Sequence, residues 1–245
     1  MKREYGIQMY SLRDSAPKDL EGALRAVSEM GYRYVEFAGF FGNPAETVKG
    51  WLDKYGLIPA STHTEGDALR PEVIDETIAY HKAIGCDTIV IPGYGTETEE
   101  ALDRFIDIVN SAIPKVRAAG MRLGYHNHSH EFIKKPYGKF VEEELYRRTD
   151  ILFEIDTFWA YNAGLDPIKL MSDMGERLLF IHIKDGYTNP DAHKAIPKAL
   201  GEGEAPVDAV RTYADEHGIL AIVESEGCDP TGALEAKRCI EYLNK

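Results

Sequence analysis

Short apolar runs alternate with amphipathic segments along the whole 245-residue sequence. The run at 88–92 is almost uninterrupted, as expected for a parallel strand that is covered on both faces. The segment at 98–119 carries Leu102, Phe105 and Ile106 on one helical stripe. We expect strands at 7–10, 34–38, 57–61, 88–92, 121–126, 151–155, 178–183 and 219–223. We expect helices at 18–30, 45–55, from 71, 98–119, 140–147, from 166, 207–217 and 232–243.

Eight strand–helix units in about 250 residues match a (β/α)8 barrel in both number and length. The competing α/β fold is an open doubly wound sheet, which usually has a glycine-rich phosphate turn after its first strand. Here the first strand is followed by Tyr-Ser-Leu-Arg at 10–13, and no linker or low-complexity tract divides the chain. The sequence therefore predicts an α/β protein, a single-domain TIM barrel over residues 1–245.

The composition argues against several partners. With 41 Asp and Glu against 28 Lys and Arg, the net charge is −13, whereas nucleic acids and anionic membranes attract cationic side chains. No stretch approaches the roughly 20 apolar residues of a membrane span, and no apolar signal core is present. The three cysteines form no Cys-x-x-Cys pair. We expect a cytoplasmic protein with no nucleic-acid or membrane partner; whether it forms a homo-oligomer is left open.

Polar residues gather where the expected strands end, which is where a TIM barrel builds its active site. Because side chains alternate along a strand, Glu154 shares a face with Asp156, and His182 shares one with Lys184. Asp156, His182 and Glu224 would then offer oxygen and nitrogen donors from three neighbouring strands. Such mixed donors suit Mn²⁺, Co²⁺, Mg²⁺ or Zn²⁺, although any one of these residues could instead bond a loop.

The fifth expected strand should supply a fourth ligand, and it ends in a run of histidines. His126, His128 and Glu131 are the candidates there, and alternation prevents all the histidines from facing one centre. Lys184 could polarise a substrate oxygen or pair with Asp185. Trp159, expected in the loop after the sixth strand, could stack on a sugar ring or simply anchor that loop.

Five motifs together resemble those of the sugar phosphate isomerase/epimerase family, xylose isomerase-like TIM barrels that also include the endonuclease IV group. They are Gly-Ile-Gln-Met-Tyr-Ser-Leu-Arg at 6–13, Tyr-His-Asn-His-Ser-His-Glu-Phe at 125–132, Asp-Thr-Phe-Trp at 156–159 with Gly-Leu-Asp-Pro at 164–167, His-Ile-Lys-Asp at 182–185 and Val-Glu-Ser-Glu at 223–226. The resemblance covers essentially the whole chain.

This resemblance implies a metal held by a glutamate on the fifth strand, an aspartate on the sixth, a histidine on the seventh and a glutamate on the eighth. Asp156, His182 and Glu224 match the last three positions. His126 stands where the fifth-strand glutamate would be, and Glu131 follows five residues later. We expect Glu131 to be the fourth ligand, with His126 as the alternative.

The resemblance further implies a metal-dependent isomerase or epimerase that acts on a sugar, keto-sugar or inosose in carbohydrate metabolism. The metal would stabilise the enediolate formed when a base removes the proton next to a carbonyl. Loss of a β-leaving group would make the protein a lyase, such as an inosose dehydratase or a 3-keto-glycoside eliminase or hydrolase. The expected catalytic residues are Glu131, Glu224, His126 and Lys184. The expected substrate-binding residues are Gln8, Tyr10, His63, Tyr94, His128 and Trp159.

Two other classes are compatible with the motifs. An endonuclease IV-like phosphodiesterase would need more metal ligands and a basic DNA-binding face, against which the net charge of −13 counts. A non-catalytic carbohydrate-binding barrel is the second alternative, since the fifth strand departs from the family pattern.

Overall fold

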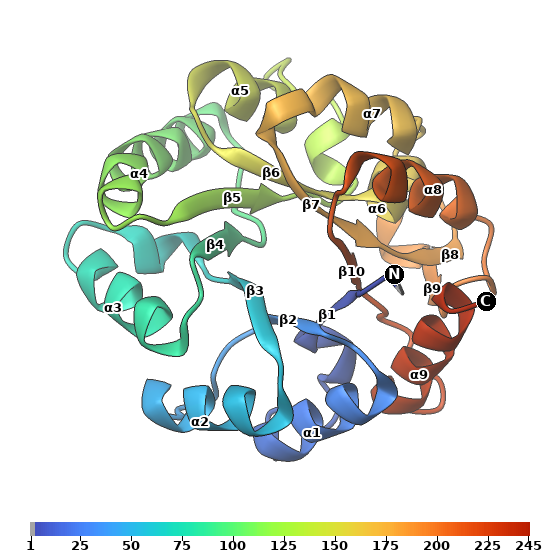
Figure 1. Cartoon of the computed structure of the whole chain (residues 1–245). Helices are drawn as coiled ribbons and strands as arrows, with labels where there is room; N and C mark the ends of the chain where they lie inside the picture. The colour runs from blue at the N-terminus through green and yellow to red at the C-terminus, as the bar shows by residue number, and fades with distance from the viewer. Residues whose placement is uncertain (1–2) are drawn as a thin grey trace.

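The structure, a computed structural model, describes residues 3–245 as a closed parallel barrel surrounded by helices (Figure 1). Around the barrel the strands follow the order β1-β10-β7-β6-β5-β4-β3-β2, so the last strand pairs with the first. The strands are β1 (Gly6–Gln8), β2 (Tyr34–Phe37), β3 (Ile58–His63), β4 (Thr88–Ile91), β5 (Arg122–His126), β6 (Leu152–Asp156), β7 (Leu178–Ile183) and β10 (Ala221–Val223). The predicted TIM barrel is confirmed.

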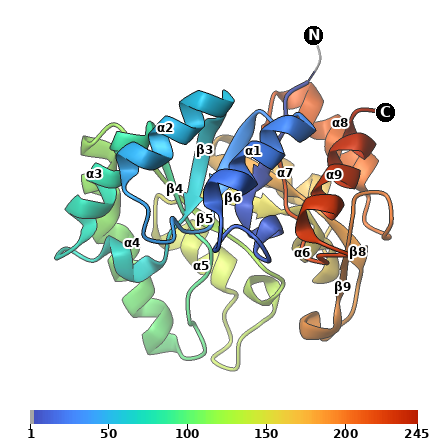
Figure 2. The same ribbon diagram turned by 90° about the horizontal axis from the view of Figure 1, so that it is seen from below.

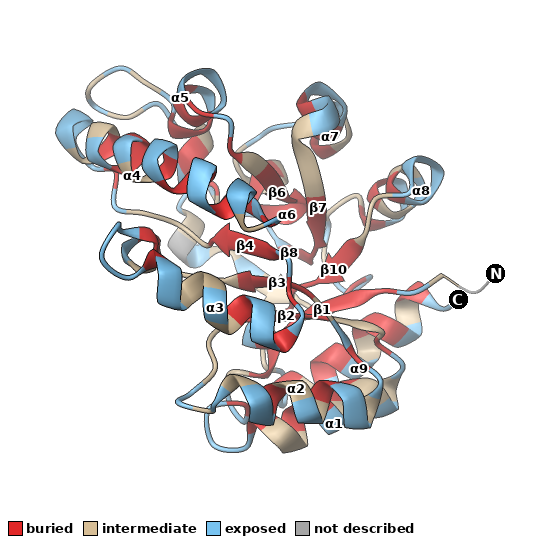
Figure 3. Ribbon diagram, turned by 60° about the vertical axis from the view of Figure 1, so that its left-hand side comes forward, coloured by how far each residue is buried: buried red, intermediate tan, exposed pale blue. Residues whose placement is uncertain are grey.

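Helices enclose the barrel, with their apolar faces buried against the strands and their polar faces toward solvent (Figure 3). The α-helices are α1 (Leu20–Met30), α2 (Ala45–Tyr55), α3 (Ile74–Ile84), α4 (Glu99–Ala118), α5 (Val141–Arg148), α6 (Thr157–Asn162), α7 (Pro167–Met174), α8 (Val207–His217) and α9 (Gly232–Leu243). Capping sets their ends: Asp19 accepts from the Gly22 N–H at 2.8 Å, and Gly31 ends α1 at a φ of 100°. None of the helices in residues 3–245 is long and apolar enough to span a membrane.

Several expected boundaries were wrong. Helix α3 begins at Ile74 rather than at Pro71, which lies in a turn just before it. Trp159 lies within α6, which starts directly after β6, and not in a loop. The sequence pattern also gave no sign of an antiparallel pair after β7, formed by β8 (Asp185–Tyr187) and β9 (Ile196–Lys198). Figure 2 shows this pair at the end of the barrel opposite the chain termini.

The inside of the barrel changes from apolar to polar along its axis. Phe180 and Ile222 pack together near the amino ends of the strands. One step further along the same strand faces come His182 and Glu224. Apolar side chains thus plug one end, and the chain places its buried polar groups at the carboxyl ends of the strands.

Candidate active site

Backbone pairing between parallel strands brings the buried polar side chains together. Asp156 on β6 pairs directly with His182 on β7. His126 on β5 likewise pairs with Glu154 on β6. Adjacent Cα partners in a sheet hold their side chains side by side on one face, so the barrel itself positions these groups.

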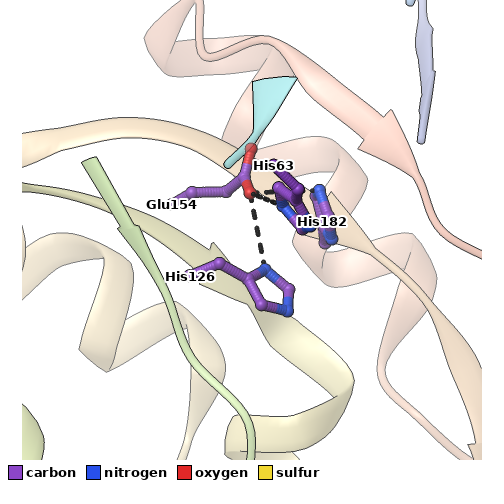
Figure 4. A group of neighbouring side chains, drawn as sticks. All are labelled: His63, His126, Glu154 and His182. Atoms are coloured by element: carbon purple, nitrogen blue, oxygen red, sulfur yellow. Dashed lines mark hydrogen bonds and ion pairs between the residues drawn. The ribbon is translucent and has the colours of Figure 1, made fainter. Parts of the chain in front are cut away.

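The deepest polar group is the inner cluster: Glu36, His63, Glu154 and His182. His182 Nε2 lies 2.6 Å from Glu36 Oε2 and 3.2 Å from Glu154 Oε2. His63 Nε2 lies 2.9 Å from the same Glu154 oxygen. Figure 4 shows His63, His126 and His182 arranged around Glu154. Neither Glu36 nor Glu154 was among the predicted site residues, yet both are fully buried here.

Glu36 is held in place from two other strands. Gln8 Nε2 donates to Glu36 Oε2 at 2.8 Å, and the Ser61 hydroxyl donates to Oε1 at 2.6 Å. Because Glu36 occupies Nε2 of His182, the other ring nitrogen is left to face the barrel mouth. That nitrogen, Nδ1, lies 3.3 Å from Glu224 Oε2.

Above the inner cluster lies the outer cluster: His126, Asp156, His182 and Glu224. One donor atom from each residue lies within 4.8 Å of the others, and all four residues are buried. Asp156 Oδ1 accepts from the Trp159 N–H at 2.8 Å, but Oδ2 has no hydrogen-bond partner. His126 Nδ1 is also buried without one, 3.4 Å from Glu154 Oε2. Buried atoms with unused lone pairs are costly, so this mixed donor set fits a divalent cation.

Burial and charge interactions compete in setting the pKa of these groups: charges prevail for Glu224 and His182, and burial prevails for Asp156 and His126. Burial disfavours the charged form of Glu224, but Lys184 and His182 lower its pKa well below the ordinary value. Burial likewise disfavours the imidazolium of His182, but Glu154 and Glu36 raise its pKa well above normal. Burial raises the pKa of Asp156 to about 7, with Lys184 pulling in the opposite direction. For His126, burial lowers the pKa well below its ordinary value, so the ring is neutral.

Lys184 is buried beside three carboxylates. Its ammonium is 3.2 Å from Glu224 Oε2 and 3.8 Å from Asp156 Oδ2, and it also bonds Glu226. It lies 4.6 Å from the centre of the Trp159 ring. Burial would lower the pKa of Lys184, but these carboxylates raise it further above normal. Lys184 therefore stays cationic, and it is the strongest of the charges that keep Glu224 ionised.

A cavity of about 380 Å³ opens over the outer cluster at the barrel mouth. Its lining residues are Tyr10, Ala38, Gly39, His63, Glu65, Pro92, His126, His128, Glu224 and Glu226. Of the expected substrate-binding residues, Tyr10, His63 and His128 are thus placed on its wall. Glu65 and Glu226 were not predicted there.

The other expected substrate-binding residues lie off this wall. Gln8 lies below it, bonded to Glu36, and Tyr94 stacks on Phe105 with ring centres 4.4 Å apart. Trp159 packs beside Lys184, and its Nε1 is buried without a partner.

Glu131 lies apart from the outer cluster. Its carboxylate accepts from the Tyr125 hydroxyl at 2.8 Å and from the His128 N–H at 2.9 Å. The His130 ring lies 3.1 Å away, so Glu131 groups with His128 and His130. The structure therefore places His126, and not Glu131, beside Asp156, His182 and Glu224.

A second cavity of about 390 Å³ lies between α5 and α7, outside the barrel. Phe140, Tyr146, Leu165 and Leu170 make most of its wall apolar. It contains none of the paired imidazoles and carboxylates found at the mouth, so we place the chemistry at the mouth.

The fold and this geometry define the class: a TIM barrel with a buried histidine–carboxylate site at the carboxyl ends of its strands. The profile of one family, described as xylose isomerase-like TIM barrel, matches residues 24–245. The chain therefore belongs to the xylose isomerase-like TIM barrel family.

Known relatives extend over almost the whole chain. The 2-oxo-tetronate isomerase of Haemophilus influenzae is 26% identical over 246 residues, which cover 90% of this chain and 91% of that protein. The crystal structure of a sugar phosphate isomerase/epimerase from Parabacteroides distasonis superposes with a TM-score of 0.84 at 26% identity, covering 99% of this chain and 98% of that one. An L-ribulose 3-epimerase shares the fold, with a TM-score of 0.73 at 16% identity over 98% and 92% of the two chains.

Proposed function

We propose that the protein is a divalent-metal-dependent isomerase or epimerase of a small sugar, which moves a proton at the carbon next to a carbonyl. The outer cluster is the main support, because it places four buried donor atoms together and leaves Asp156 Oδ2 without a hydrogen-bond partner. The relatives named as an isomerase and an isomerase/epimerase support the reaction class.

His126, Asp156, His182 and Glu224 would hold the ion. We assign the fifth-strand position to His126, because the Glu131 carboxylate is already used by Tyr125 and the His128 N–H. A divalent ion bound there supplies a Lewis acid that polarises a carbonyl oxygen.

Glu224 is the proposed base. It lines the cavity, and Lys184 and His182 keep it ionised, so it can accept a proton from a sugar carbon. His128 lines the same cavity and is held neutral by burial, with Nδ1 free of hydrogen bonds. Once protonated, Glu224 can return that proton to the substrate, and the neutral His128 imidazole beside it can hydrogen-bond a substrate oxygen. Lys184 would act through its ion pairs, holding both Glu224 and Glu226 in position and keeping Glu224 ionised.

The test combines metal analysis with proton exchange. Elemental analysis of the purified protein should find a divalent metal at about one ion per chain. A panel of ketoses and inososes incubated in D₂O should reveal a substrate that exchanges its α-proton. Elimination of water during that exchange would identify a lyase instead of an isomerase.

Two matched variants distinguish the effect of a substitution in the outer cluster from that of a substitution on the surface. Asp156→Ala should lose both bound metal and turnover while keeping the folded circular-dichroism spectrum. Asp173→Asn, which alters an exposed carboxylate paired with Lys169, should change neither. Full activity in protein stripped of metal would refute the proposal.

A further inference from the structure

Two buried carboxylates fill the loops that follow the last two strands of the barrel. TIM barrels frequently bind phosphate at this place, where backbone N–H groups and a helix N-terminus point toward the mouth. In this chain the carboxylate of Asp185, at the start of β8, bonds the first of these segments, and that of Glu235, in the first turn of α9, bonds the second; each residue has 1% of its surface exposed.

Asp185 follows β7 and uses both of its oxygens on backbone N–H groups. Oδ1 accepts from Gly186 at 2.8 Å and from Ala205 at 3.0 Å. Oδ2 accepts from Gly201 at 2.9 Å and from Gly203 at 3.0 Å. A side chain at Gly203 would place its Cβ 2.3 Å from Asp185 Oδ1, so the loop closes tightly on the carboxylate. The four backbone N–H groups that could surround a phosphate thus already donate to Asp185.

Glu235 likewise uses both of its oxygens to accept hydrogen bonds from the loop after β10. Its Oε1 accepts from the Gly227 N–H at 3.0 Å and from the Ser225 hydroxyl. Its Oε2 accepts from the Asp229 N–H at 2.7 Å. A dianion entering this loop would have to displace a buried carboxylate that already has three donors.

The cavity itself presents acidic groups. Glu65, Glu224 and Glu226 line it, and none of its described lining residues is Lys or Arg. The ammonium of Lys184 is held by Glu224 and Glu226. Arg13, near the rim, donates to the Glu226 carbonyl and lies 4.8 Å from the Tyr10 ring centre. A phosphate ester, with about −1.5 to −2 charges at pH 7, would meet Glu65 and Glu226 and no Lys or Arg from the described lining residues, and the charge of a divalent ion in the outer cluster would already be offset by Asp156 and Glu224.

We infer that the site takes an unphosphorylated sugar and discriminates against the terminal phosphate ester of the same sugar. This inference rests on the proposed function and deepens it by naming the substrate class. The inferred substrate class differs from the one in the name of the Parabacteroides relative, a sugar phosphate isomerase/epimerase.

Matched substrate pairs test the inference on the metal-loaded protein. Ribulose, xylulose and fructose are each compared with their terminal phosphate ester, by α-proton exchange in D₂O and by titration calorimetry. We expect kcat/KM and affinity to be at least tenfold higher for a free sugar than for its ester. Glu226→Gln should narrow that ratio several-fold, because it removes one acidic wall and releases part of Lys184, whereas Asp173→Asn should leave the ratio unchanged.

The outcomes separate the two proposals. An ester that reacts or binds as well as its parent sugar would overturn the inference and leave the isomerase proposal standing. Absence of exchange with every sugar would count against the isomerase proposal, while the calorimetric comparison of sugar and ester would still decide the question of phosphate.

Discussion

Replacing Glu36 by Gln should weaken metal binding although Glu36 is not a proposed ligand. Glu36 Oε2 accepts from His182 Nε2 at 2.6 Å, which leaves Nδ1 of that ring to face Glu224. A carboxylate bonded to the far nitrogen of a ligating histidine fixes the ring and raises its basicity. Gln is nearly isosteric and can turn its amide nitrogen toward the Ser61 hydroxyl, which can accept as well as donate. The variant therefore removes mainly the negative charge.

Losses of such partners typically cost 10- to 100-fold in metal affinity, or about 1.4 to 2.8 kcal/mol. We expect a loss in this range for Glu36→Gln at pH 8, measured by competition with a fluorescent chelator. Glu36 also raises the pKa of His182, so the wild type must release a more tightly held proton when it binds the ion. The difference between the two proteins should therefore narrow as the pH falls to 6.

Glu142→Gln is the matched control, since Glu142 is a carboxylate with 3% exposure that lies outside the outer cluster. It should bind the metal like the wild type. A Glu36→Gln protein that is folded and binds within twofold of the wild type at pH 8 would refute the argument that Glu36 orients His182.

Three further predictions concern stability. Burial raises the pKa of Glu142 well above normal, and neither of its carboxylate oxygens has a hydrogen-bond partner. Its contribution to the free energy of unfolding is therefore fully present below pH 4.5, and it is lost as the pH rises through the folded-state pKa. Glu142→Gln should thus stabilise the protein by about 1–3 kcal/mol at pH 8 and by little at pH 4 in urea unfolding; a gain independent of pH would contradict this. Phe105→Ala, which empties a fully buried ring position, should cost about 3–5 kcal/mol in the same assay, and a loss under 1 kcal/mol would show that the site collapses. Asp185→Ala leaves four backbone N–H groups without their hydrogen-bond acceptor. The variant should therefore be cleaved faster than the wild type within segment 186–205 in limited proteolysis. Unchanged cleavage would show that water replaces the carboxylate.

The sequence pattern was enough to predict the barrel and to predict which end of the barrel carries the candidate site. Strand-length apolar runs and helical stripes depend on local periodicity, which one sequence shows directly. Asp156, His182 and Glu224 could be grouped because the ends of parallel strands meet at one edge of a barrel. Their grouping follows from topology and alternation alone, and the structure places them together.

The sequence pattern could not predict that Glu36 and Glu154 belong to the site. Each is an acidic residue inside an apolar strand, Tyr-Val-Glu-Phe and Leu-Phe-Glu-Ile-Asp, and that position was the available signal. Their partners lie on other strands, 146 residues away for Glu36 and His182, so no local spacing reveals the contact. The place of Glu131 could not be read from its spacing either, because it lies in a 3₁₀ turn, His130–Phe132, where its carboxylate accepts from the His128 N–H.

The two halves of the barrel contribute differently to the site. All four members of the outer cluster come from β5 or later in the chain, whereas Gln8, Glu36 and His63 come from the first three strands. The carboxyl-terminal half thus carries the donors, and the amino-terminal half adds Glu36, the nearest partner of His182 Nε2. A carboxyl-terminal half-barrel produced alone would retain every proposed ligand, with Glu154 beside His182, but would lose the Glu36 carboxylate that holds the His182 ring. Combining the two halves from different members of this family would therefore exchange the ligands and their alignment as separate modules.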